Sequence, residues 1–132
     1  MPLKQLYAGF AYEVLAYARS DRACQVEGHL EALDLRDQKR VAALLSVSAD
    51  LGPPRNQEKC RKLKGENSWE FKAGQQRIFW CYDPLGARRI ILLHGFTKKA
   101  KKTPSQALHA GREAYREVIT EAQQRMEGKG DR

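Results

Sequence analysis

Four short segments of β character, separated by turn-forming residues, make up most of the chain after Pro54. They read CRKLKG, SWEFKAG, QRIFWCYD and RRIILLHGF. One separator, DPLG at residues 83–86, places Asp, Pro and Gly at the first, second and fourth positions of a type I turn. Connections this short join antiparallel neighbours, because a parallel pair needs a crossover of about a dozen residues or more. The pattern therefore predicts a four-stranded antiparallel meander.

The first part of the chain predicts one strand and two helices. The segment YEVLAYA, residues 12–18, is rich in β-forming residues. Apolar residues then follow helical spacing over residues 26–33 and again over 41–51, where Asp37 is a suitable N-terminal cap. The Gly-Pro-Pro sequence at 52–54 ends the second helix. The short link between the two helices predicts a helical hairpin.

A final helix is predicted from the sequence Thr-Pro-Ser-Gln onwards. Thr103 can cap this helix, Pro104 suits its first position, and Gln106 completes a capping box. An apolar stripe at helical spacing then continues to Met126. The chain thus ends on a long amphipathic helix.

Together these elements predict a single small α+β domain, made of an N-terminal strand, a helical hairpin, the meander and a C-terminal helix. Its 132 residues, of which 42% are hydrophobic, are enough to form one core. We expect the domain to span residues 12–126, with an N-terminal extension at 1–11 and a flexible tail at 127–132.

Cysteine and histidine usage predicts a cytoplasmic protein without a metal or a cofactor. Cys24, Cys60 and Cys81 are odd in number and form no CxxC pair, which fits reduced thiols. The histidines share no metal-ligand spacing with them. Glu13 interrupts the apolar stretch near the N-terminus, unlike a signal peptide, and no run approaches the roughly 18 apolar residues of a membrane span. We therefore expect no membrane contact.

The positive charge of the chain is concentrated in its middle. The net charge is +8, and residues 55–102 hold 13 basic and 4 acidic residues, a net of +9. The remainder holds 11 basic and 12 acidic residues. A locally concentrated positive field favours a polyanionic partner such as nucleic acid or an acidic protein.

Strand alternation predicts a basic face on the meander. Trp69 and Phe71 share one side of their strand, and we expect them to pack with Leu63 under the helices. The opposite face then carries Lys62, Lys64, Glu70, Lys72 and Arg77, and the loop HGFTKKAKKTP borders it with Lys98, Lys99, Lys101 and Lys102. Two interpretations are open. Half-covered antiparallel sheets often have a polar solvent face, whereas a face with nearly one sign of charge favours phosphate.

Such a surface could support RNA strand cleavage, which needs a base, an acid and cations around the phosphate. Arg77 suits phosphate binding, and crowding among the lysines lowers their pKa values, which suits acid–base chemistry near neutral pH. Glu70 has two possible roles. It could act as a base or orient a lysine, or it could form a cross-strand ion pair with Lys72 or Arg77 worth about 0.2–1 kcal/mol.

His94 is a second candidate for the general acid. Strand alternation places it on the same side as Leu92 and Phe96, which favours a buried, hydrogen-bonded histidine over a catalytic one. His29 and His109 are both expected on helix surfaces.

The run KLKGENSWEFKAGQQRIFWCYDPLGARRIILLHGFTKKAKKTP resembles the core signature of RelE/HigB-type toxins of bacterial toxin–antitoxin pairs, particularly the phage-derived HigB-like branch. Its most specific part is LLHGFTKKAKKTP, and the resemblance covers residues 12–120. It implies a microbial-RNase-like α+β fold and cleavage of mRNA within the translating ribosome, without a metal. It also implies an antitoxin partner, usually a small helix-turn-helix protein encoded beside the toxin.

By motif position, the resemblance implies phosphate binding or transition-state chemistry at Glu70, Arg77, Lys98 and Lys99. The other basic residues expected to bind RNA are Lys62, Lys64, Lys72, Lys101 and Lys102. The sequence departs from the signature in three places. Lys72 stands where an arginine is usual, Ala100-Lys101 replaces Thr-Gln, and the C-terminal tyrosine of some RelE toxins has no clear counterpart.

Two other functions remain open beside the ribosome-dependent endoribonuclease. One is a non-enzymatic poison of the ParE type, which shares the fold and binds DNA gyrase. The other is a prophage nucleic-acid-binding module without toxicity. The lysines of the loop favour the endoribonuclease, because a gyrase binder does not need a phosphate-lined face.

Overall fold

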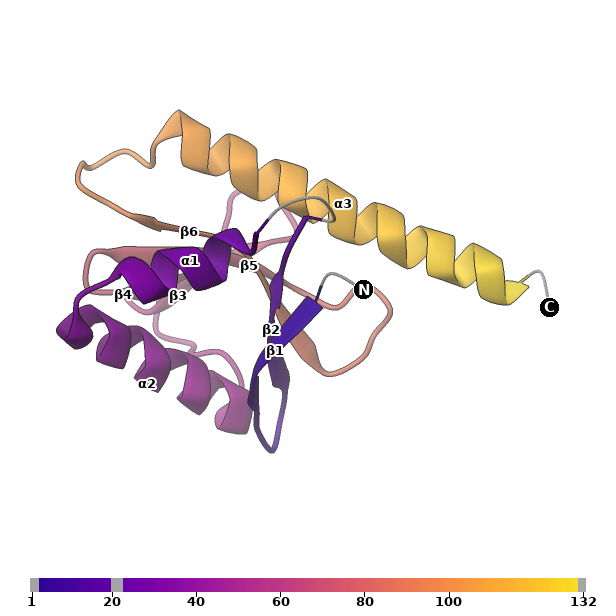
Figure 1. Cartoon of the computed structure of the whole chain (residues 1–132), viewed down its shortest axis with the longest axis horizontal. Coiled ribbons are helices and arrows are strands. Elements are labelled where there is room, and N and C mark those ends of the chain that lie inside the picture. The colour runs from indigo at the N-terminus through magenta and orange to yellow at the C-terminus, as the bar shows by residue number, and fades with distance from the viewer. Residues whose placement is uncertain (1–2, 20–22, 131–132) are drawn as a thin grey trace.

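A six-stranded sheet with helices on both faces forms the fold (Figure 1). The computed structural model describes residues 3–19 and 23–130. Helices α1 and α2 pack on one face of the sheet and α3 crosses the other. The elements in chain order are β1 (Leu3–Ala8), β2 (Glu13–Tyr17), α1 (Gln25–Ala32), α2 (Leu35–Leu51), β3 (Cys60–Lys62), β4 (Trp69–Ala73), β5 (Gln76–Tyr82), β6 (Arg89–Thr97) and α3 (Ser105–Gly130).

The predicted α+β class is confirmed, but the sheet contains more than the predicted meander. Strands β3 to β6 form the antiparallel meander, and β2 adds to it in parallel with β6, pairing Val14 with Ile90. Strand β1 then pairs antiparallel with β2 at the edge of the sheet. Residues 3–8, predicted as an extension outside the domain, are therefore part of its sheet.

Two helix boundaries also differ from the predicted ones. Helix α2 is capped by Asp34, whose carboxylate accepts a hydrogen bond from the Asp37 N–H at 2.8 Å. Asp37, the predicted cap, therefore lies inside the first turn. Helix α3 continues to Gly130, so residues 127–130 are helical rather than a flexible tail, while 131–132 lie outside the described residues. None of the described helices is long and apolar enough to span a membrane.

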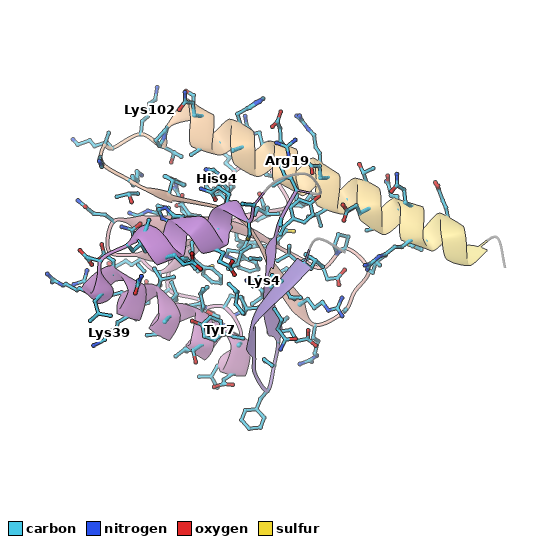
Figure 2. The ribbon with its side chains drawn as sticks, in the orientation of Figure 1. Lys4, Tyr7, Arg19, Lys39, His94 and Lys102 are labelled. Atoms are coloured by element: carbon cyan, nitrogen blue, oxygen red, sulfur yellow. The ribbon has the colours of Figure 1, made fainter. Side chains whose placement is uncertain are left out.

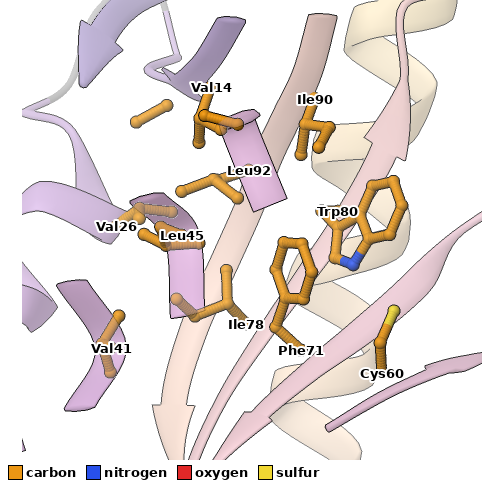
Figure 3. Packing of buried hydrophobic residues seen from close by; sticks show 12 residues of the cluster. Val14, Val26, Val41, Leu45, Cys60, Phe71, Ile78, Trp80, Ile90 and Leu92 are labelled. Carbon is orange, nitrogen blue, oxygen red and sulfur yellow. The ribbon is translucent and has the colours of Figure 1, made fainter. Parts of the chain in front are cut away.

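The larger core lies between the sheet and α1 and α2 (Figure 3). Trp80 is fully buried at its centre, with its ring 4.8 Å from that of Phe71 and 5.2 Å from that of Trp69. Val41 and Leu45 of α2 pack on the same cluster. Each large apolar side chain buried in this way contributes about 1.5–3 kcal/mol to stability, so this cluster holds the sheet and the helical hairpin together.

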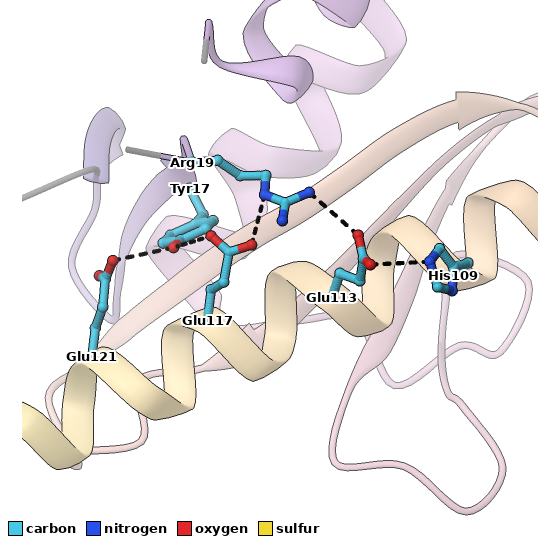
Figure 4. Close-up of polar contacts among 6 residues, drawn as sticks. All are labelled: Tyr17, Arg19, His109, Glu113, Glu117 and Glu121. Carbon is cyan, nitrogen blue, oxygen red and sulfur yellow. Dashed lines mark hydrogen bonds and ion pairs between the residues drawn. The ribbon is translucent and has the colours of Figure 1, made fainter. Parts of the chain in front are cut away.

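The second core lies beneath α3 and is centred on Phe79. Gly111 allows the helix to approach this ring closely, because a Cβ there would lie 2.6 Å from the Phe79 Cδ2 atom. Leu63 packs in this core, so its predicted position under α1 and α2 is wrong. Polar contacts fasten the same helix to the end of β2, where the Tyr17 hydroxyl donates to Glu117 at 3.0 Å (Figure 4).

A β-bulge in β6 changes the face on which His94 lies. Phe79 pairs with His94, but Trp80 pairs with Leu92, so Leu93 is an extra residue in β6. His94 therefore lies on the α3 side with Phe96, whereas Leu92 lies in the core under α1 and α2. The alternation that grouped all three residues was wrong because it assumed a regular strand.

We predict that Gly111→Ala lowers the free energy of unfolding by about 1–3 kcal/mol, because its methyl group overpacks the buried Phe79 ring. The matched control is Gly128→Ala in the same helix, where a Cβ would meet nothing within 4 Å. That change should leave stability unaltered or raise it by up to about 1 kcal/mol. Urea denaturation measures both, and equal stabilisation by the two substitutions would contradict the close contact.

Candidate phosphate-binding site

The register of β3, β4 and β5 decides which charged residues share a face. Glu70 pairs with Phe79, and Lys72 pairs with Arg77. Because directly opposed residues point to the same side of a sheet, Glu70, Lys72 and Arg77 all lie on the α3 side with Phe79. This grouping agrees with the strand alternation.

Lys62 does not lie on this face of the strands as predicted. Lys62 pairs with Trp69 and its Nζ lies 5.9 Å from the centre of the Trp69 ring, on the side of α1 and α2. Lys64 follows the end of β3 and lines a cavity beneath α3. Arg61, which the sequence interpretation did not select, is the β3 residue opposite Glu70. Alternation counted from the apolar Cys60 would have found it.

Glu70 is a fully buried carboxylate held by Arg61. Its side chain is 0% exposed, and Oε1 accepts a hydrogen bond from the Arg61 Nε at 3.1 Å. Oε2 makes no hydrogen bond within the part of the chain that the structure describes. A buried carboxylate needs a nearby cation to offset the loss of hydration. Arg61, rather than the predicted Lys72 or Arg77, supplies the ion pair.

Lys72 is a half-buried amine among other cations. Burial lowers its pKa below the usual 10.5, and the positive charge of Arg61 lowers it further, with smaller effects from Arg77 and Lys98. Glu70 acts in the opposite direction but does not reverse the shift. Lys72 therefore loses its proton at a lower pH than an ordinary surface lysine does.

Arg77 and Lys98 meet at the β4–β5 turn. The Arg77 Nη1 donates to the Gly74 carbonyl at 2.6 Å and to the Gln76 carbonyl at 3.0 Å. The backbone N–H of Lys98 donates to the Gln75 carbonyl at 2.8 Å, which fastens the start of the lysine loop to the same turn. Three cations, Arg61, Arg77 and Lys98, thus lie close enough to Lys72 to lower its pKa, and Arg61 also pairs with the buried Glu70.

The other lysines of the loop lie further along it. Lys98 is half-buried, whereas Lys99, Lys101 and Lys102 are exposed. Figure 2 shows Lys102 beside the start of α3. The structure therefore brings one of the two predicted paired lysines into the cluster, and the exposed three can extend its positive field.

A cavity lies beside Phe79 on the α3 side of the sheet. It has a volume of about 560 Å³ and lies between residues 63–68 and α3. An ion pair of 2.5 Å between the Arg112 Nε and the Glu66 Oε1 joins its two walls. Its lining includes apolar, aromatic and basic side chains, namely Leu63, Lys64, Phe79, Leu108, Tyr115 and Arg116.

Histidine contributes little to the charged cluster. Burial lowers the pKa of half-buried His94 below its usual value, and the nearby His29 lowers it further, so His94 is neutral at pH 7. The Nε2 of His29 lies 3.0 Å from the Gln76 Oε1. Among the described residues no cluster of three histidine, cysteine or acidic side chains is suited to hold a metal ion.

Comparison with known families gives one match. The family model described as "Phage derived protein Gp49-like (DUF891)" matches residues 29–127, which include α2, the meander and most of α3. No curated protein matches the chain significantly. All four cations of the cluster and Glu70 lie within the matched region.

We predict that Lys72→Met raises the free energy of unfolding at neutral pH and low salt by about 0.2–1 kcal/mol, the range for cross-strand charge pairs. The substitution removes the cost of burying the Lys72 charge and its repulsion with Arg61 and with the opposed Arg77. The gain should shrink in high salt, and also as the pH rises towards 10.5, where Lys72 loses its proton in the folded and unfolded chains alike.

Urea denaturation at several pH values tests this expectation, with the exposed Lys101→Met as the control. Equal effects of the two substitutions, or a gain that grows with pH, would contradict the crowding of charge around Lys72.

Proposed function

Because the chain belongs to the Gp49-like family of phage-derived proteins, a family of RelE-like toxins of toxin–antitoxin systems, we propose that it is a HigB-like endoribonuclease that cleaves mRNA on the ribosome. The observation that carries this proposal is the grouping of Arg61, Arg77 and Lys98 near Lys72, with Arg61 also paired to the buried Glu70. Four cations grouped in this way form a site for a phosphate that gains negative charge during reaction.

The proposed reaction is attack of a ribose 2′-oxygen on the adjacent phosphorus. The new O2′–P bond forms as the bond from phosphorus to the 5′-oxygen of the next nucleotide breaks, giving a 2′,3′-cyclic phosphate and a 5′-hydroxyl end. One proton leaves the 2′-hydroxyl and another reaches the departing 5′-oxygen.

Lys72 is the residue best suited to accept the proton of the 2′-hydroxyl. Its lowered pKa makes the neutral amine available, and it lies opposite Arg77 on the open end of the face. Arg77 and Arg61 would hold the phosphate oxygens through their guanidinium groups, which remain charged at every relevant pH. Lys98, half-buried beside the same turn, would protonate the leaving oxygen.

Glu70 is better suited to positioning than to proton transfer. Its carboxylate is 0% exposed, and one of its oxygens accepts a hydrogen bond from Arg61. It would therefore orient the Arg61 guanidinium towards the phosphate from below. The exposed lysines of the loop, Lys99, Lys101 and Lys102, would bind flanking phosphates of the mRNA or ribosomal RNA.

We predict that inducing the protein in a bacterium produces new mRNA 5′ ends linked to codon position, and that Arg77→Ala abolishes them because a phosphate-binding guanidinium is lost. Arg88→Ala, which removes an exposed arginine outside the cluster, should cleave like the unmodified chain. Transcript-wide mapping of 5′ ends measures both. Growth arrest with intact mRNA and induced DNA damage would overturn the proposal in favour of the gyrase-poison alternative.

We also predict a distinctive pH dependence of cleavage. The rate with a defined mRNA on purified ribosomes should rise with pH, because a base must be deprotonated, and should level off at the lowered pKa of Lys72, below 10.5. Lys72→Arg keeps the positive charge but does not titrate, so it should lower the rate by about 10²–10⁴-fold and remove the rise. An unchanged pH profile in that variant would show that another group is the base.

A further inference from the structure

Two partly exposed aromatic rings line a pocket at the β3 edge of the sheet, on the side of α1 and α2. Trp69 is half-buried and Tyr82 is 38% exposed, and their ring centres lie 5.0 Å apart in an edge-to-face contact. The fully buried Trp80 supports both, with its ring centre 5.2 Å from that of Trp69 and 5.0 Å from that of Tyr82. The pocket has a volume of about 410 Å³ and is bounded by Pro53 and Pro54, which follow α2. That volume is within the range of about 300–1,000 Å³ for small-ligand sites.

The charged side chains at this pocket are all basic. Its lining includes Arg55, Arg61 and Lys62, and none of the described residues that form it is acidic. Arg61 pairs with Glu70 on the other side of the sheet, which leaves the exposed Arg55 and Lys62 to bind an anion. The Lys62 Nζ lies 5.9 Å from the centre of the Trp69 ring. Because a lysine side chain is long and flexible, this amine can bind a phosphate while a base stacks on the ring beside it.

Aromatic rings next to cations fit an unpaired nucleotide better than they fit other anions. A base stacks on partly exposed rings whatever its identity, while its phosphate pairs with a neighbouring cation. The bases of a duplex are stacked on one another and cannot reach such rings, whereas those of a single strand can. An acidic peptide would pair with the two cations but would leave both rings without a stacking partner.

We propose that this pocket binds an unpaired nucleotide of single-stranded RNA. The base stacks against the rings of Trp69 and Tyr82, and the phosphate binds the two exposed cations. The register of β3 to β5 places the pocket across the sheet from Arg77, so it is a second RNA surface, separate from the proposed cleavage site. The RNA contact that the sequence predicted for Lys62 is thereby assigned to the opposite side of the sheet. The choice of RNA rests on the proposed function, whereas binding in the pocket does not require RNA cleavage.

The intrinsic fluorescence of the chain reports on this pocket, because its two tryptophans, Trp69 and Trp80, both line it. The probe is a ten-nucleotide oligoadenylate with 2′-O-methyl riboses, which cannot undergo attack by a 2′-oxygen. Titrating it into the chain should quench the fluorescence as a base stacks on Trp69. Trp69→Phe keeps a ring but removes the reporter, so it should lose most of the quenching and still bind a labelled oligonucleotide by fluorescence anisotropy.

The stacking contact is tested at Tyr82. Tyr82→Ala removes a partly exposed ring and should weaken oligonucleotide binding by about 5–100-fold, the range expected for one stacked base. Tyr82→Phe keeps the ring and should bind within about twofold of the unmodified chain. The matched aromatic control is Phe10→Ala, because Phe10 is 97% exposed and its N–H donates to the Asp50 carboxylate rather than lying among cations. It should also bind within about twofold.

The phosphate contact is tested by the salt dependence of binding. Lys62→Met should reduce the slope of log K against log salt by about 0.7, the value for one phosphate contact on a single strand. Lys39→Met removes an exposed lysine near the start of α2, far from the prolines that follow its end, and should leave the slope unchanged. Thermal melts confirm that each variant is folded before its affinity is interpreted.

Two probes carry similar charge without bases, namely an abasic oligonucleotide and a peptide of ten glutamates, and neither should quench. Equal quenching by either would show that charge alone drives binding and would overturn the proposal, as would normal binding by Tyr82→Ala. Binding of a DNA oligonucleotide of the same sequence at least tenfold more tightly would assign the pocket to DNA instead. If the oligoadenylate quenches but the induced chain cleaves no mRNA, the pocket stands and the endoribonuclease assignment falls. Cleavage without quenching would remove the pocket assignment alone.

Discussion

The stack of aromatic rings on one side of β4 and β5 fixes the register on which the charged face depends. Trp80 is 0% exposed and stacks on both Phe71 and Trp69 in the core under α1 and α2. A slip of one residue in either strand would move these rings out of that core. Burial of the aromatic rings therefore places Glu70, Lys72 and Arg77 together on the opposite side, although the cations Lys72 and Arg77 repel each other.

Helix α3 limits how much of that side is available for binding. It covers Phe79, Cys81 and Leu93 and is held close to Phe79 at Gly111. The charged residues near the β4–β5 turn are left beyond its coverage, where a buried carboxylate and partly buried cations lie close to solvent. Crowded like charges reduce stability, and retaining them is typical of functional sites, which carry perturbed pKa values more often than structural surfaces do.

Local sequence patterns predicted the elements that depend on neighbouring residues, such as alternating strands and the short turns between them. The alternation of SWEFKAG and QRIFWCYD placed β4 and β5 correctly, and short turns indicated the meander. Strand β1 was missed because its stability comes from pairing with β2, which its own sequence does not reveal. Arg61 was missed for a similar reason. Strand β3 ends at Lys62, so Leu63 does not continue its alternation. Alternation that started from Leu63 therefore assigned every residue of β3 to the wrong face.

The β4–β5 turn joins the charged face of the sheet to helix α2. Gly74 adopts a φ of +60°, a conformation that favours glycine, and its carbonyl accepts from Arg77 while Arg40 of α2 packs against it. Arg77 of the charged face and Arg40 of α2 are thus arranged around one short, sterically restricted turn.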